Sequence, residues 1–448
     1  MRAVLAACLL ALLLAPSLLA VGPDAFPANV RVTTSNGPAN EVHIAVDPNN
    51  AQRLVAGAKD YTLGASNACG VTRVWAGAYA SSDGGATWGN TLVPGYPGSP
   101  TPSALSAYGC SSDPVVAFDG LGLAHYLGIA INGPGQLNAL WTATSPDGGA
   151  SWPVIATHMT MPGQAWFNDK EWFAFDPVLQ IAYVTWTVFP AVGLPGVSGI
   201  WMLRCVLGQA CGPPQPIGFS PLGQCGSAQG SYPVVGPDHE VYVVWTSFGP
   251  SGICFAKSTD LGTTFSAPRI ISTASTVNGQ PNTAFRSLTM PAMAVDTSAG
   301  PTRGNLYVVW HDRRYDSSDV LMVRSTDGGA TWTAAQKVND DPPGKSNFMP
   351  AIGVAPDGRV DVAFYDRRDD PANRLLTVYL ASSTDGGATF PNERVSSAQF
   401  NGDLGRHQGG FAFIGDYIGV ASSADRAVPI WADTRDGTSQ AYVALVPR

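Results

Sequence analysis

The chain has 448 residues, of which 33 are acidic and 25 basic, so its formal net charge is −8. An acidic chain without a basic run is not expected to bind nucleic acid or an anionic membrane surface. Only 13% of residues are charged, whereas 50 glycines and 36 prolines indicate a turn-rich, all-β protein.

The first residues are typical of a secretory signal. One positive charge, Arg2, precedes an apolar run over residues 3–14, and small residues follow up to Ala20. We expect residues 1–20 to be removed and residues 21–448 to form one domain, secreted or held in the periplasm or cell envelope. No other stretch approaches the ~20 apolar residues of a membrane span, so we predict no membrane insertion.

Cysteine usage agrees with an oxidising compartment. Six cysteines follow the signal segment, an even number that suits three disulfides. Proximity in the sequence favours the pairs Cys69 with Cys110, Cys205 with Cys211, and Cys225 with Cys254. Neither a Cys-x-x-Cys pair nor a histidine cluster occurs, so we predict no zinc site and assign no cofactor.

A strand–turn–strand pattern recurs along the chain. Each copy has a short apolar strand, a turn with Asp, Pro or Gly, and a strand rich in β-branched and aromatic residues, as in 173–177 followed by 183–186. The seven turns lie at Asp47, Asp119, Asp176, Asp238, Asp296, Asp357 and about Asp425. This spacing suits propeller blades of four strands. We predict a single all-β propeller of seven four-stranded antiparallel blades, with six blades as the alternative.

Five turns of nearly identical sequence lie between these units. They span 81–88, 145–152, 258–265, 325–332 and 383–390, and all fit Ser-x-Asp-x-Gly-x-Thr/Ser-Trp/Phe. The pattern predicts a tight turn in which Asp accepts backbone hydrogen bonds, Gly supplies a positive φ, and the aromatic ring packs into the sheet. The third unit lacks this turn, and a disulfide between Cys205 and Cys211 could take its place.

The seventh unit also lacks the turn and ends at Arg448 after only three strands. Residues 28–34 resemble the fourth-strand segments at 336–339 and 393–396. We therefore predict that the N-terminal strand completes the last blade and closes the ring, which removes two exposed sheet edges.

The five repeated turns resemble the Asp box, or bacterial neuraminidase repeat, so the chain is similar to the sialidase-like β-propellers. The resemblance implies that the boxes lie on the face away from the ligand. It also implies a ligand site on the opposite rim, where one set of loops leads into the first strands and another joins the second and third strands.

The resemblance suggests which arginines bind substrate, because sialidases hold the sugar carboxylate with three of them. Second strands of the last three blades end alike, at Trp310–Arg313, Tyr365–Arg367 and Trp431–Arg435. Their arginines are the candidates, with Arg286 as substitute, since guanidinium groups bind carboxylates bidentately. The alternative is that each forms a salt bridge with a nearby Asp and caps a loop.

Retaining sialidases use a Tyr nucleophile activated by a Glu, with an Asp as acid/base. Applied here, the resemblance implies Glu171 as the activating residue, Tyr417 as nucleophile and Asp60 or Asp169 as the acid. Trp166 could stack on a sugar face. Glutamate is scarce, and Glu41 is the other glutamate expected on this rim; all these positions also suit ordinary loop residues.

Two departures from the sialidases concern activity. The chain has no Arg-Ile-Pro segment, which supplies one of the three arginines in the active enzymes, and seven blades exceed the six of those enzymes. We predict a secreted, monomeric exo-sialidase-type glycoside hydrolase that acts on terminal sugars of glycans or glycoconjugates. The alternative is a non-catalytic propeller whose rim binds a glycan or an extracellular protein. The carboxylates of 366–370 could hold calcium, but salt bridges explain them as well, so no metal is assigned.

Overall fold

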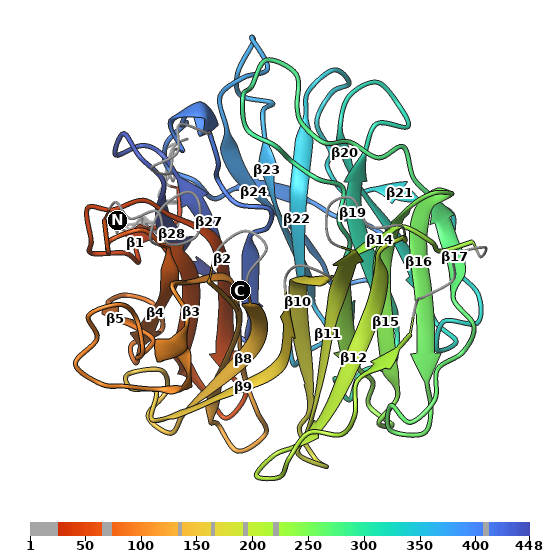
Figure 1. The fold of residues 1–448 in the computed structure, drawn as a ribbon. Coiled ribbons are helices and arrows are strands. Elements are labelled where there is room, and N and C mark those ends of the chain that lie inside the picture. Colours follow the sequence, from red (N-terminus) through yellow and green to blue (C-terminus); the bar gives the residue numbers. More distant parts are fainter. Residues whose placement is uncertain are drawn as a thin grey trace, which may run out of the picture.

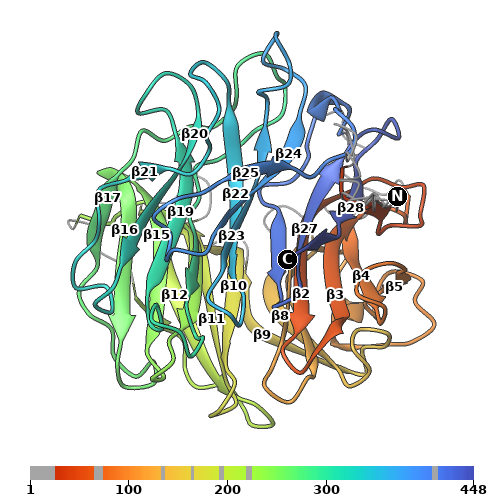
Figure 2. The same ribbon diagram turned by 180° about the vertical axis from the view of Figure 1, so that it is seen from behind.

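The computed structural model describes residues 26–64, 74–132, 137–162, 166–190, 196–217, 224–405 and 412–448. The strands of this part of the chain form seven antiparallel sheets around a central axis (Figures 1 and 2). The seven-bladed propeller is therefore confirmed. The predicted signal segment and Cys69 lie outside the described residues, so the predictions that rest on them remain predictions.

Six blades contain four consecutive strands each. Blade 1 is β2 (Ala39–Asp47), β3 (Asn50–Asp60), β4 (Trp75–Ser81) and β5 (Gly89–Leu92); blade 2 is β6 (Cys110–Phe118), β7 (Ala124–Ile131), β8 (Leu137–Ser145) and β9 (Val154–Pro162); blade 3 is β10 (Trp166–Asp176), β11 (Ile181–Pro190), β12 (Gly199–Val206) and β13 (Gln215–Pro216). Blade 4 is β14 (Ala228–Val235), β15 (Val241–Phe248), β16 (Ser251–Ser258) and β17 (Arg269–Thr273); blade 5 is β18 (Ala292–Val295), β19 (Leu306–Asp312), β20 (Asp319–Ser325) and β21 (Gln336–Lys337); blade 6 is β22 (Asn347–Val354), β23 (Val360–Asp366), β24 (Thr377–Ser383) and β25 (Asn392–Arg394). Short 3-10 turns span Ala104–Ala107 (η1) and Gly402–Leu404 (η2).

Blade 7 joins the two ends of the chain. Strands β26 (Gly419–Ser422), β27 (Arg426–Asp433) and β28 (Gln440–Ala444) come from the C-terminus, and β1 (Asn29–Arg31) is its fourth strand, paired with β28; the short β29 (Val446–Pro447) pairs with β27. Just beyond β1, the Val32 N–H donates to the Ala441 carbonyl at 2.8 Å. The predicted closure of the ring by the N-terminal strand is confirmed.

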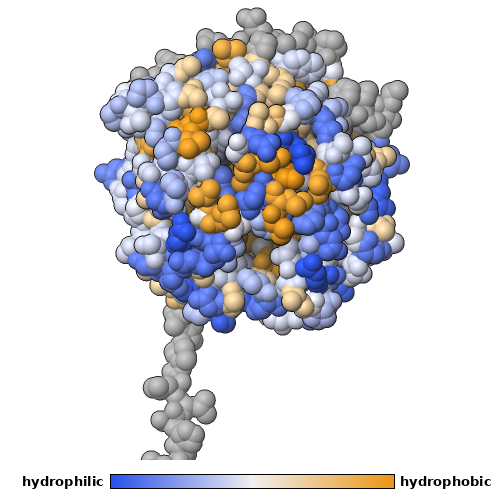
Figure 3. Space-filling view, turned by 90° about the horizontal axis from the view of Figure 1, so that it is seen from below, coloured by the Kyte–Doolittle hydropathy of each residue, from blue (hydrophilic) through white to orange (hydrophobic). Residues whose placement is uncertain are grey.

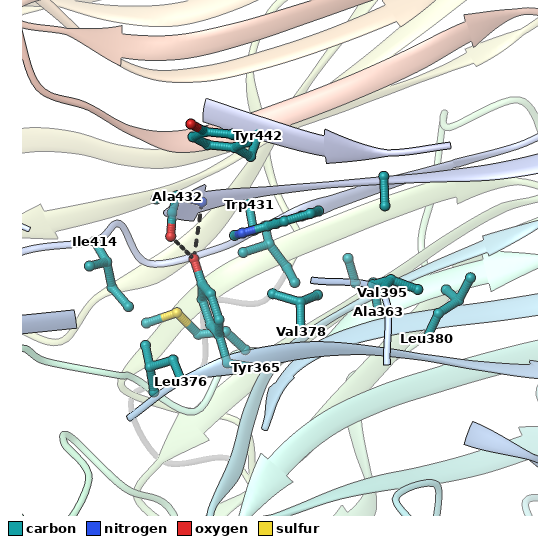
Figure 4. Close-up of a cluster of buried hydrophobic side chains, with 14 of the residues drawn as sticks. Ala363, Tyr365, Leu376, Val378, Leu380, Val395, Ile414, Trp431, Ala432 and Tyr442 are labelled. Carbon is teal, nitrogen blue, oxygen red and sulfur yellow. Dashed lines mark hydrogen bonds between the residues drawn. The ribbon is translucent and has the colours of Figure 1, made fainter. Parts of the chain in front are cut away.

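Large side chains from second and third strands fill the space between blades. Tyr365 of β23 illustrates this: its hydroxyl donates to the Ala432 carbonyl (3.0 Å) and accepts from the Ala432 N–H (3.1 Å) of β27, beside the buried Trp431 (Figure 4). A buried hydroxyl needs such partners, because an unpaired polar group in the core would destabilise the fold. Blades 6 and 7 are thus joined by hydrogen bonds as well as by apolar packing.

The repeated turns have the hydrogen bonds that their sequence predicts. In 325–332, the Ser325 hydroxyl donates to Asp327 (2.7 Å) and accepts from the Gly329 N–H (2.9 Å), and the Thr331 hydroxyl donates to Asp327 (2.6 Å). Gly328 and Gly329 have φ of 62° and 79°, which favours glycine. All five turns follow the third strand of a blade, so they lie at the lower end of Figure 1, away from the loops that lead into the first strands. In Figure 3, apolar side chains surround a hollow near the middle of this lower face.

These turns predict an acid-dependent loss of stability. Hydrogen bonds from the Thr264 backbone and hydroxyl lower the pKa of Asp260 to about 2, well below the ~3.9 of an unfolded Asp. A depressed folded pKa adds stability above about pH 4, which is lost as pH falls toward 2. We expect Asp260→Asn to have a lower melting temperature than the wild type at pH 6, and this difference to shrink below about pH 3. A difference that stays constant across pH would contradict this account.

Two predicted disulfides are present, Cys205–Cys211 and Cys225–Cys254. Cys110 is also disulfide-bonded. Disulfides are consistent with an extracellular or periplasmic location. Among the described residues, no helix has the length and apolar character needed to span a membrane.

Candidate functional site

The first strands of five blades share a bulge near the axis. In β2, β6, β10, β14 and β22, strand pairing skips two residues. The first skipped residue has a positive φ in each case: Glu41 (50°), Asp113 (55°), Lys170 (50°), Gly230 (71°) and Met349 (50°). Such a conformation costs a non-glycine residue on the order of 1 kcal/mol, and functional sites are where this strain is commonly found. Three of the four non-glycine residues are charged and lie in adjacent blades.

Three of these five residues line a pocket on the propeller axis, whereas Glu41 and Asp113 are not among its lining residues. Lys170, Gly230 and Met349 line it, together with His43, Trp172 and Tyr417. The internal volume of about 50 Å³ has room for a few water molecules. A sugar ring would therefore have to bind at the mouth of this pocket rather than inside it.

Glu41 and Asp113 form an unequal carboxyl pair beside this pocket, close enough to its lining residue Tyr417 for their charges to affect it. Both are buried. Burial and the Asp113 charge raise the pKa of Glu41 to about 8, so Glu41 is largely protonated at neutral pH. Burial alone would raise the pKa of Asp113, but Lys59, Lys170 and hydrogen bonds from Ser112 and Glu41 lower it. A proton donor thus lies beside an ionised carboxylate.

Three cations surround this pair. Lys59 Nζ lies 3.2 Å from Glu41 Oε2, and Lys170 Nζ lies 3.7 Å from the centre of the Tyr417 ring. The Arg286 guanidinium binds Asp416 bidentately, with N–O distances of 2.9 and 2.5 Å, and remains half exposed. With Glu41 protonated, the cations balance or exceed the ionised carboxylates, which suits an anionic ligand.

Two further predicted acids, Asp169 and Glu171, lie close to this group of charged residues. We call the group the charged cluster; its members are Glu41, Asp113, Lys59, Lys170 and Arg286. Burial and Asp113 raise the pKa of the half-buried Asp169 to about 7, and Asp169 accepts a hydrogen bond from Gln229 (3.2 Å). Glu171 is 1% exposed, and neither carboxyl oxygen has a hydrogen-bond partner among the described residues. Burial, followed by the Asp113 charge, raises its pKa well above the ordinary value. Glu171 is therefore a neutral, buried carboxyl group.

Tyr417 is one of the aromatic residues that line the axial pocket, together with Trp172 and Tyr232. Its hydroxyl donates to the Pro114 carbonyl at 3.0 Å, and its ring packs edge-on against Trp172. Burial and the charges of Glu41 and Asp113 raise its pKa well above the ordinary value. In this geometry Tyr417 is a neutral phenol whose proton is engaged by a backbone carbonyl.

Asp60 and Trp166 do not line the axial pocket. Asp60 accepts hydrogen bonds from Tyr79 (2.9 Å) and from the Thr62 N–H (2.8 Å), so both of its oxygens are engaged. Trp166, 40% exposed, lines a different pocket that includes Val188 and Trp201.

The three candidate arginines share no partner in the described part of the chain. Arg313 donates to the Gly279 carbonyl (2.7 Å), and Arg435 pairs with Asp433 (2.6 Å). Arg367 is fully buried and donates to the carbonyls of Pro281 and Asn373. Of the predicted arginines, only Arg286 belongs to the charged cluster.

Sequence reasoning named neither Asp113 nor Lys170 as a site residue. The sequence does contain a pattern that marks them. When the first strands are aligned at their bulges, Glu41, Asp113 and Lys170 occupy the same position, directly before the apolar part of each strand. No group of three or more metal-binding side chains occurs in the described ranges.

The sequence matches no protein-family model and no curated protein, but solved structures share the fold. An α-L-arabinanase from Penicillium chrysogenum, complexed with arabinobiose, is 12% identical with a TM-score of 0.53, covering 83% of this chain and 99% of that one. An ulvan lyase of polysaccharide lyase family PL25 is 12% identical with a TM-score of 0.51, covering 94% and 96%. A "Hadza microbial sialidase" is 13% identical with a TM-score of 0.48, covering 88% and 76%. At these identities the likeness establishes the propeller fold, and a specific likeness to sialidases is not shown.

Proposed function

We propose that this protein is a secreted carbohydrate-active enzyme that cleaves a glycosidic bond of an acidic glycan at the axial mouth. The observation that carries the proposal is the neutral Glu41 beside the ionised Asp113, since carboxyl groups with separated pKa values mark acid and base roles. The arabinanase and the ulvan lyase, which share the fold, act on carbohydrate, and this supports the substrate class.

In the proposed reaction Glu41 is the general acid. Its proton passes to the glycosidic oxygen as the C–O bond breaks, while Asp113 takes a proton from the attacking water, whose oxygen forms the new bond to carbon. Glycoside hydrolases in which water attacks directly separate their two carboxyl groups by about 6.5–9.5 Å. Here both groups are buried and Asp113 accepts the Glu41 hydrogen bond, so catalysis requires the pair to separate and admit the glycosidic oxygen and the water.

The finer proposal is an exo-acting hydrolase whose substrate ends in an acidic sugar, as a sialidase substrate does, but in which water attacks directly without a Tyr nucleophile. Lys170 and Arg286 are the cations at the mouth that would bind its carboxylate. Asp169, with a pKa raised to about 7, is a second proton-transfer group near this position. Glu171, which is buried, and Tyr417, which is partly buried, stay neutral in this scheme and support the charged residues rather than attack the sugar.

The pH profile of the reaction tests the role of Glu41. Activity should fall as pH rises through about 8, where Glu41 loses its proton. Because the Lys59 charge lowers the pKa of Glu41, Lys59→Met should raise that pKa and move the basic limb of the kcat/KM profile to higher pH. An unmoved or downward-shifted limb in Lys59→Met would show that another group sets it.

The first experiment is incubation of the purified protein with a panel of fluorogenic glycosides, sialosides included, and of acidic and neutral polysaccharides. New reducing ends without ultraviolet-absorbing unsaturated sugars would indicate hydrolysis, and unsaturated products would indicate elimination. Turnover of acidic substrates but not of neutral ones supports the proposal. Turnover restricted to neutral substrates would show that Lys170 and Arg286 do not bind a substrate carboxylate.

A second candidate function is binding without catalysis, which the arginines favour. Arg435 pairs with Asp433, Arg314 with Asp312 and Arg368 with Asp366, so these rim guanidinium groups are already engaged. If no glycan is cleaved, the mouth becomes a candidate glycan-binding surface, and saturable binding to a glycan array is the corresponding measurement.

A further inference from the structure

Each repeated turn covers part of the blade before it. A Cβ added to the second turn glycine would lie 2.8 Å from Val55 in blade 1 for Gly149, and 3.1 Å from Tyr307 in blade 5 for Gly387. The turns of blades 1, 4 and 5 make equally close contacts with Leu445, Tyr183 and Phe255. The glycine therefore lets the turn backbone lie directly on the flank of its neighbour.

Strand pairing identifies the covered position in each blade. The pair next to the first Ser of the turn is Val55–Ala80 in blade 1, Tyr242–Lys257 in blade 4 and Tyr307–Arg324 in blade 5. In blade 2 the equivalent pair is His125–Thr144. Blade 3, which follows, lacks the repeated turn, so no such turn covers this pair.

The other blade without this turn is blade 7, and there the flank of blade 6 is covered by other means. Arg359 binds Asp361 and donates to the carbonyls of Ser423 and Arg426, and Arg448 donates to Ser382 (2.9 Å). Asp361–Ser382 is the pair equivalent to His125–Thr144. The flank between blades 2 and 3 thus differs from that between blades 6 and 7.

Between blades 2 and 3 the structure has a pocket of about 230 Å³ instead. It is lined by the rings of His125, His158, Phe173 and Phe175, by aliphatic side chains, and by the loop that the Cys205–Cys211 disulfide closes. This volume exceeds the ~150 Å³ apolar cavity that binds benzene in another protein. The loop closed by the Cys205–Cys211 disulfide thus stands where the other blades have the repeated turn, but it does not fill the space that such a turn would occupy.

The polar groups in this pocket suit an uncharged ligand. Thr144 and His125 share a hydrogen bond (3.1 Å), the other ring nitrogen of His125 lies 3.0 Å from Asp119, and Thr142 pairs with His158 (2.8 Å). Burial lowers the pKa of His158, so its imidazole is neutral at neutral pH. A charged ligand would lose its hydration in this pocket, and the lining residues offer no unpaired charge of opposite sign to compensate. An aromatic ring with one hydroxyl group could instead form hydrogen bonds with the hydroxyl groups of Thr142 and Thr144.

We propose that the pocket between blades 2 and 3 is a binding site for a small, uncharged aromatic ligand. It is lined by residues of blades 2 and 3 only, and none of them belongs to the charged cluster at the axial mouth. The inference is therefore independent of the proposed catalytic activity.

Titration of the full-length protein with phenol, followed by ligand-observed NMR, tests this site. Cyclohexanol and benzoate serve as non-aromatic and charged comparators. Ala156→Phe places a ring in the pocket from an exposed position on β9 and should weaken phenol binding by at least about tenfold, because the ring occupies the ligand's volume. Ala334→Phe, at an exposed position just before β21 in blade 5, is the matched control and should bind phenol like the wild type.

Saturable phenol binding that Ala156→Phe removes and Ala334→Phe keeps would support the site. Absence of saturable binding, equal binding by Ala156→Phe, or preference for benzoate would overturn it. Thr144→Val adds a second test, because loss of the hydroxyl should weaken phenol while leaving benzene unaffected. Failure of any of these leaves the glycan-cleavage assays unchanged, so the two proposals can fail separately.

Discussion

Replacing Glu41 with Gln should lower kcat/KM on the cleaved glycan by at least about a hundredfold at neutral pH, the usual contribution of a general acid. Gln has nearly the same size as the protonated acid, and its amide N–H can replace the Glu41 hydroxyl as hydrogen-bond donor to Asp113. The fold should therefore persist while the transferable proton is lost. Initial rates on the best substrate of the panel, with circular dichroism as the check on folding, measure this.

Glu393→Gln is the matched control for this substitution. Glu393 lies on the outer strand β25, is half exposed and pairs with Arg448 (2.6 Å), so its replacement should leave kcat/KM unchanged. Asp113→Asn should also lower the rate, because it removes the proton acceptor. If Glu41→Gln retained wild-type activity on a substrate that the wild type cleaves, the acid would have to be another residue, and the high pKa of Asp169 would make it the next candidate.

The blade count could be predicted because it depends on local patterns. Apolar strands, turn residues and the repeated Ser-x-Asp-x-Gly segments recur within each blade, and hydrogen bonds inside one turn, such as Ser325 to Asp327, involve neighbours in the sequence. The closure by β1 could also be predicted, since one missing strand at the C-terminus and one spare strand at the N-terminus complement each other.

The carboxyl pair beside the axial pocket could not be predicted in the same way. Glu41 and Asp113 belong to different blades, and they face each other because each sits in a bulge with positive φ. Motif reasoning places a residue on a rim, but it does not tell which carboxyl group burial protonates and which one neighbouring lysines keep ionised. The same limit explains the arginines: Arg313, Arg367 and Arg435 occur at similar positions in the sequence, yet each binds a different partner.

Val32→Asp should produce the largest loss of stability among the proposed substitutions. Val32 is fully buried beside the pairing of β1 with β28, and its N–H bonds to the Ala441 carbonyl. A carboxylate there would be buried among apolar residues such as Ala39, Val428 and Val443, and a buried charge without a partner costs several kcal/mol. We expect the free energy of unfolding in urea to fall by about 3–5 kcal/mol.

The expected loss has a structural cause beyond the single side chain. The pairing of β1 with β28 joins the two ends of the chain within blade 7, so displacing β1 would leave β28 with an unpaired edge and expose the last blade to aggregation. Val154→Asp, at a 60% exposed position on β9, makes the same chemical change outside the core and should cost less than about 1 kcal/mol. If Val32→Asp cost as little stability as Val154→Asp, the ring would remain closed without the N-terminal strand. A loss confined to Val32→Asp would establish that this strand holds the propeller shut. Release of β1 would then be seen as faster hydrogen exchange at Ala441 and Val443.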